Sequence, residues 1–144
     1  MTAEVHRPVH LHGRLVLLVA AGGVLGALAR YGLGFVIPAP GGWPLPTLVI
    51  NLSGALVLGA LLEGLSRRGP DAGWRQILRL AVGTGFLGAF TTYSTLALDA
   101  VHLFDAGRST EGVWYLGTSL LGGVAATVAG IWLAARQHRR MVRQ

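Results

Sequence analysis

Residues 83–96 read GTGFLGAFTTYSTL and lie inside a segment, residues 80–98, that is otherwise apolar. Three glycines and six hydroxyl-bearing residues stand in this stretch. An isolated Ser or Thr in a membrane helix usually bonds back to the carbonyl four residues earlier. A cluster this dense, beginning with glycine, instead favours a broken helix, which survives at membrane depth only where protein or water satisfies the backbone. Freed carbonyls there bind a hard cation, whereas freed N–H groups and hydroxyls bind an anion.

Three further apolar segments accompany this stretch, at residues 15–37, 45–62 and 113–135. Their lengths are close to the ~20 residues that a membrane-spanning helix needs. Only 12% of the 144 residues are charged, against about 25% in soluble domains. We therefore expect an all-α membrane protein, one domain over residues 1–144, with four transmembrane helices over about 15–37, 45–65, 77–103 and 113–135 and the third broken mid-membrane. Glycines in the spans, Gly22-x-x-x-Gly26 among them, predict close helix packing.

The basic residues predict the orientation in the membrane. All twelve are arginines. With four spans, the two termini and the loop between the second and third spans share one side, which carries Arg7, Arg14, Arg67, Arg68, Arg75, Arg79, Arg136, Arg139, Arg140 and Arg143. The opposite side carries Arg108 alone. The positive-inside rule then places both termini in the cytoplasm of a multi-pass protein of the cell inner (plasma) membrane. Arginines beside apolar segments suit a membrane surface, so we expect no nucleic-acid partner.

Four polar residues inside the spans are candidates for function. Arg30 in the first segment either snorkels to the interface or lines a vestibule that attracts anions. Asn51, in the middle of the second, either forms an interhelical hydrogen bond or lines an aqueous path. Tyr115 and Ser119 begin an i, i+4 stripe on the fourth, which is either a packing face or a row of hydrogen-bond donors.

The residues that are missing from the spans narrow the function further. No carboxylate lies at a span centre, because Glu63 and Asp99 fall near segment ends, and a proton-coupled cation exporter usually needs one. No metal-binding His pair and no Ser with a plausible His/Asp partner occur there, so we do not expect an enzyme. A path of neutral donors with one arginine suits a small inorganic anion, whose water must be replaced by several donors. Aromatic ring edges, which are positive, can contribute.

The chain resembles the Fluc fluoride channels, also called CrcB proteins, over about residues 22–136. The resemblance is carried by GxxLGAxxRY at residues 22–31, TLxxNxxG at 47–54 and GFxGxxTTYST at 85–95, in this order. The last of the three motifs is the most specific.

The resemblance implies a fold, an activity and a set of site residues. Small four-span subunits pair as an antiparallel dimer with two pores, and fluoride leaves the cell passively, which lowers its cytoplasmic concentration and toxicity. A structural sodium ion, which is not transported, is held by backbone carbonyls at the third-helix break, on Gly88 and Thr91 in this sequence. The implied ion pathway comprises Arg30, Asn51, Tyr93, Ser94, Tyr115 and Ser119.

Two departures from the family pattern keep alternatives open. The family usually has two Phe, three residues apart, where this chain has Tyr93 and Leu96, and Leu96 has no ring edge. The arginine bias of ten to one is also unexpected for a subunit that inserts both ways, so the dimer partner is either a second copy or a related subunit of reversed bias. The rival functions are a small multidrug-type exporter and a non-conducting partner subunit of a heterodimeric channel.

Overall fold

The computed structural model describes residues 12–142, with side chains up to Arg139, and this part of the chain is helical without any strand. Arg7 and Arg143, two of the arginines counted above, lie outside it. The elements in chain order are α1 (Gly13–Val36), the 3₁₀ turn η2 (Pro40–Gly42), α2 (Leu45–Ser66), α3 (Trp74–Leu78), the π-helix η3 (Arg79–Leu87), α4 (Gly88–Phe90), α5 (Tyr93–Asp105) and α6 (Ser109–Val142).

Three helices of the described chain, α1, α2 and α6, are long and apolar enough to cross a membrane. The third expected span is instead a row of shorter segments, α3, η3, α4 and α5, with an interruption between Phe90 and Tyr93. A broken third helix was the central expectation from residues 83–96, and it is confirmed. The π-helical stretch within this row was not expected.

The helix ends follow the expected spans closely except at α6, which begins at Ser109 and continues to Val142 rather than covering 113–135. Glu111 stands in its first turn, where a negative charge stabilises the helix dipole. After Ala135 the sequence continues with Arg and Gln, which are good helix formers. The helix therefore continues beyond its apolar part at both ends.

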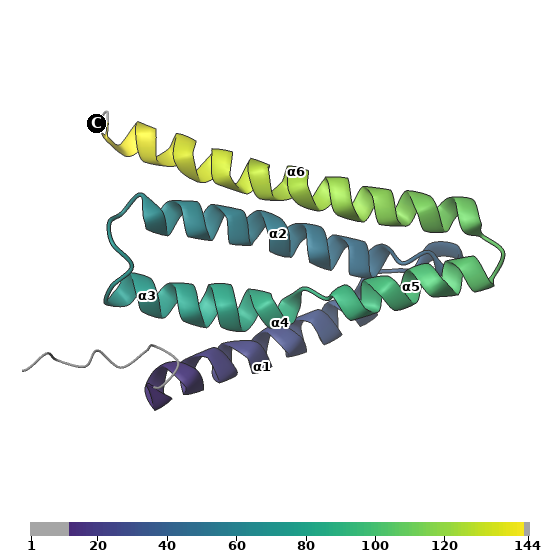
Figure 1. Cartoon of the computed structure of the whole chain (residues 1–144), viewed down its shortest axis with the longest axis horizontal. Helices are drawn as coiled ribbons and strands as arrows, with labels where there is room; N and C mark the ends of the chain where they lie inside the picture. The colour runs from purple at the N-terminus through teal and green to yellow at the C-terminus, as the bar shows by residue number, and fades with distance from the viewer. Residues whose placement is uncertain (1–11, 143–144) are drawn as a thin grey trace, which may run out of the picture.

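The helices lie side by side (Figure 1). α2 packs against α6 on one side and against η3 on the other, while α1 packs across η3 and α4. The start of α1, the connection between α2 and α3, and the end of α6 lie at one end of the molecule, and the turn between α5 and α6 lies at the other. This arrangement brings the arginine-rich segments to a common end.

Glycines allow the backbones to touch where the helices cross. A side chain on Gly22 or Gly26 of α1 would collide with the carbonyl oxygens of Ala81 and Phe86 in η3. A Cβ on Gly59 of α2 would stand 2.5 Å from the carbonyl oxygen of Thr127 in α6. Such approaches are typical of small residues at membrane helix contacts. The predicted packing role of the Gly22-x-x-x-Gly26 pair is confirmed.

Two apolar clusters flank the interruption in the third span. Ile50, Leu87 and Phe90 form one cluster on the α4 side. The other cluster lies on the α5 side and consists of Leu48, Ala100, Leu103 and Tyr115, with Trp43, Leu52 and Leu96 packed around it. Because α2 contributes to both clusters, it spans the break and presents side chains to it.

Candidate functional site

The interruption of the third span is two residues long and is bound by a side chain of α2. Thr91 and Thr92 are extended, with ψ of 155° and 120°. The Asn51 amide donates to the Thr92 carbonyl at 2.9 Å and accepts from the Thr92 N–H at 2.8 Å. One side chain therefore satisfies both backbone groups of a residue that is 9% exposed. Of the two roles expected for Asn51, the interhelical hydrogen bond is present here, and one amide hydrogen remains for another acceptor.

At the break two backbone N–H groups donate to side chains. In a continuous helix they would donate to backbone carbonyls. The Thr92 N–H, which would donate to Gly88, donates to Asn51. The Thr95 N–H, which would donate to Thr91, donates to the Thr92 hydroxyl at 3.2 Å and so caps α5. The carbonyls of Gly88 and Thr91 therefore lose their helical donors, and carbonyl oxygens are ligands that hard cations accept.

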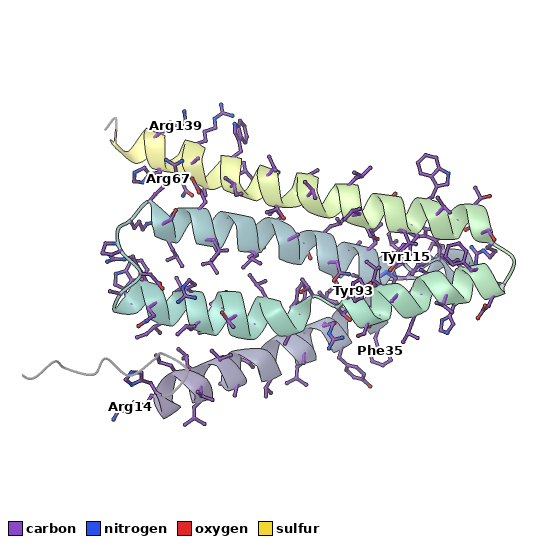
Figure 2. The ribbon with its side chains drawn as sticks, viewed as in Figure 1. Arg14, Phe35, Arg67, Tyr93, Tyr115 and Arg139 are labelled. Atoms are coloured by element: carbon purple, nitrogen blue, oxygen red, sulfur yellow. The ribbon has the colours of Figure 1, made fainter. Side chains whose placement is uncertain are left out.

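Hydroxyl groups gather at the start of α5. Thr92 Oγ1 lies 3.0 Å from Thr95 Oγ1 and 3.3 Å from Ser94 Oγ. Ser94 is exposed, and Tyr93 is 82% exposed. Figure 2 shows the labelled Tyr93 beside the interruption. Leu96, the departure from the expected aromatic pair, packs inward against the cluster that contains Tyr115.

The carboxylate of Asp99, which was not among the expected site residues, lies beside Tyr115. Thr47 donates to Asp99 Oδ2 at 2.7 Å, and the Tyr115 hydroxyl lies 3.4 Å from the same oxygen. Tyr115 is fully buried and meets Trp43 edge-on, with ring centroids 5.8 Å apart. The three polar residues come from α2, α5 and α6. A signal was present, since Asp99 interrupts an apolar run, but its partners are far away in sequence.

Two buried polar atoms have no hydrogen-bond partner among the side chains that the structure describes, Arg30 Nε and Ser119 Oγ. Ser119 follows Tyr115 by one turn on α6. Arg30 lies on α1, where it lines a crevice of about 480 Å³ with Val24, Leu28 and Tyr31. Buried polar atoms in proteins almost always have a partner, and the described part of this chain supplies none to these two atoms. Because α1 packs on η3 and α4 while α6 packs on α2 and α5, one chain does not bring Arg30 and Ser119 together.

Charges are separated along the molecule. Figure 2 shows Arg14, Arg67 and Arg139 at the same end. Near that end the Arg79 guanidinium bonds to Asp71 at 2.9 Å and holds the pKa of that carboxyl below its ordinary value. At the other end Arg108 is paired with Glu111 and also donates to the Gly41 carbonyl, which joins two connections.

Comparison with known proteins decides the family. Residues 17–131 match the family model described as "CrcB-like protein, Camphor Resistance (CrcB)". The chain belongs to the CrcB family. The match covers the first glycine pair, Asn51, the break and the stripe on α6, so the resemblance expected from the three motifs is confirmed.

Curated CrcB relatives share much of this sequence. The "Fluoride-specific ion channel FluC 2" of Leifsonia xyli is 49% identical over 89% of this chain and 88% of its own length. The protein of the same name from Symbiobacterium thermophilum is 50% identical over 82% of this chain and 95% of its own. The "Fluoride-specific ion channel FluC" of Hyphomonas neptunium is 39% identical over 83% and 94%. These names describe ion channels, so the family is not one of enzymes.

Proposed function

We propose that this CrcB-family chain is a subunit of a fluoride-selective channel through which fluoride leaves the cell passively. The observation that carries the proposal is the Ser119 hydroxyl, which is buried on α6 without a protein partner. The relatives named as fluoride-specific ion channels support it. Passive efflux lowers the cytoplasmic concentration of fluoride and therefore its toxicity.

Fluoride holds its water tightly, so a selective path must replace that water with several donors at once. The remaining Asn51 amide hydrogen and the Ser119 and Ser94 hydroxyls are neutral donors, and we assign them to the pathway with Tyr115 and Tyr93. Neutral donors bind the anion without trapping it as a fixed positive charge does, which permits release. Tyr93 offers a positive ring edge in addition to its hydroxyl.

Arg30 has a different role in this proposal. A guanidinium stays charged at all physiological pH values and cannot relay protons. Its Nε is buried without a partner, and its side chain lines an open crevice on α1. We assign Arg30 to a vestibule in which its charge raises the local concentration of anions.

Gly88 and Thr91 would hold a structural sodium ion that is not transported. The described residues contain no group of three His, Cys, Asp or Glu side chains placed for a metal, and backbone carbonyl oxygens are ligands that hard cations accept. The two carbonyls that lose their helical donors at the break fit a hard monovalent cation. One chain offers two such oxygens, and twofold pairing would supply four.

Sodium removal tests this assignment. We expect the dimer to dissociate more readily, and fluoride flux to fall, when sodium is replaced by the large cation N-methylglucamine at equal ionic strength. No sodium should cross the membrane together with the fluoride. Equal dimer stability and equal flux after rigorous sodium removal would remove Gly88 and Thr91 from the proposal.

We further propose that the subunit crosses the inner membrane four times, with α3 to α5 as the third span and both termini in the cytoplasm, and that it works as an antiparallel dimer. Large aromatic side chains beside the break support a partner, because Tyr93 is 82% exposed and Tyr31 and Phe35 of α1 are 68% and 73% exposed. The partner is a second copy or a related subunit.

The class of function is tested by loading liposomes that carry the purified chain with fluoride or with chloride. We expect rapid, passive loss of fluoride and retention of chloride. Loss that requires a proton gradient, or export of an organic cation, would instead indicate a multidrug-type exporter. Absence of fluoride loss until a related subunit is added would indicate a non-conducting partner.

A further inference from the structure

A crevice at the arginine-rich end has no part in the fluoride proposal. It lies between the last turns of α2 and the matching part of α6, and its volume is about 460 Å³. Its walls come from both helices and include Ala60, Gly64, Arg68, Leu133, Arg136 and His138.

Two cations of this crevice lack a carboxylate partner in the described part of the chain. The ion pairs at this end join Arg67 to Glu63 and Arg79 to Asp71, so neither acid neutralises Arg68 or Arg136. Arg68 donates through Nη1 to the Gly64 carbonyl at 2.8 Å, which leaves most of its five N–H donors available.

The Arg68 bond to Gly64 also offsets the helix dipole, which would otherwise repel an anion. The carbonyl end of α2 carries about half a negative charge, and the guanidinium stands directly upon it. Two full positive charges outweigh the remainder, so the crevice attracts anions.

The depth of the second arginine is set by an aromatic ring. The Arg136 guanidinium carbon stands 5.0 Å from the centroid of the Trp132 ring, and Trp132 is 53% exposed. Tryptophan favours the boundary between hydrocarbon and headgroups, and the cation–π contact keeps the charge beside the ring. In the four-span orientation that we propose, this places Arg136 at the level of the lipid phosphates.

Besides the polar residues Gln137 and His138, the remaining walls are small or apolar. Ala60, Ala134 and Leu133 line the crevice, and Leu133 is 49% exposed, which continues the apolar surface of α6. We propose that this crevice binds the phosphate headgroup of an anionic phospholipid, with Arg68 and Arg136 on the phosphate and the small apolar wall against the glycerol. Basic pockets between helices on the cytoplasmic side bind such headgroups in other membrane proteins.

Native mass spectrometry of the full-length chain, titrated with phosphatidylglycerol, phosphatidylcholine or inorganic phosphate, tests the proposal. An arginine in contact with the bound headgroup contributes about a fivefold preference for an anionic lipid, and two contribute about thirtyfold. We expect the Arg68→Gln/Arg136→Gln double variant to lose that preference. The Arg67→Gln/Arg139→Gln double variant removes the same charge from the same two helical regions outside the crevice and should keep it.

A neutral variant separates shape from charge. Ala134→Trp fills the crevice without changing any charge, and we expect it to lose bound phosphatidylglycerol while keeping its elution as a folded species. If the Arg67→Gln/Arg139→Gln control loses the preference for phosphatidylglycerol equally, the lipid is attracted by the overall positive charge of this end, and the proposed site is wrong. Retention of the lipid by both crevice variants, or inorganic phosphate binding as tightly as phosphatidylglycerol, would also overturn the proposal.

Discussion

The side-chain amide of Asn51 bonds both backbone groups of Thr92, and for the Thr92 N–H it replaces the helical bond that the third span loses at the break. Asn51 was selected from sequence because an amide in an apolar span must find a partner, and the partner is the broken backbone itself. The position of the break follows from Thr92, whose hydroxyl accepts from the Thr95 N–H and starts α5. The dense Gly and hydroxyl pattern therefore predicted the break and its place.

Replacing Asn51 should destabilise the backbone at the break and also stop fluoride conduction. In Asn51→Leu the Thr92 N–H is left unpaired in a buried position, at a cost of about 1–3 kcal/mol. We expect a clearly lower thermal unfolding midpoint in detergent and loss of fluoride flux. Ser53→Ala, two residues away, removes a hydroxyl that bonds to its own helix and should change neither. An Asn51→Leu protein as stable as the wild type would contradict this role.

Asp99 shows what single-residue patterns miss. Its partners Thr47 and Tyr115 are 52 and 16 residues away in sequence, so no local spacing encodes the cluster. Arg30 and Ser119 are candidates on sequence grounds, and the lack of hydrogen-bond partners for Arg30 Nε and Ser119 Oγ depends on packing between helices, which appears only in three dimensions.

At the scale of elements, glycine pairs position the broken span. Gly22 and Gly26 allow α1 to touch the η3 backbone. A Cβ added to Gly85 of η3 would lie 3.1 Å from the Cα of Gly22. The G-x-x-x-G spacing predicts such a contact, and the apolar runs predict the long helices. The π-helical geometry of η3 follows from neither pattern.

A methyl group added to α1 should destabilise its contact with η3 at Gly26 but not at Gly23. Gly26→Ala places a Cβ against the backbone of Phe86, which cannot move aside, and we expect a loss of about 1–3 kcal/mol, the usual cost of overpacking. Gly23→Ala on the same helix meets its nearest atoms at 3.9 Å and should be neutral. Thermal unfolding of the two variants in the same detergent measures this difference, and equal midpoints would contradict the packing.

At the scale of the whole molecule, the arginine distribution carries information that the fold of one chain does not. The start of α1, the end of α2 and the end of α6 share one end (Figure 1), so the described ends of the first and last helices group with the second loop as expected. The dimer partner leaves no such record in a single chain.

Native topology distinguishes the two possible partners. Our proposal that the charge bias holds this subunit with both termini inside leads us to expect an antiparallel mate of reversed bias. Reporters fused after Gln144, expressed at native level, should report a cytoplasmic C-terminus in nearly all molecules. If half of the molecules place the C-terminus outside, the chain pairs with itself and the related-subunit partner is excluded.

Fluoride efflux from liposomes that carry the Ser119→Ala variant tests the central claim most directly. Its hydroxyl has no protein partner, so its removal should leave the unfolding midpoint unchanged. A hydrogen bond to a charged group contributes about 1.5–3 kcal/mol, so fluoride flux should fall about ten- to hundredfold. Thr118→Ala, on the exposed neighbouring position, should conduct as the wild type does. Wild-type fluoride flux in a folded Ser119→Ala protein would contradict the proposed pathway.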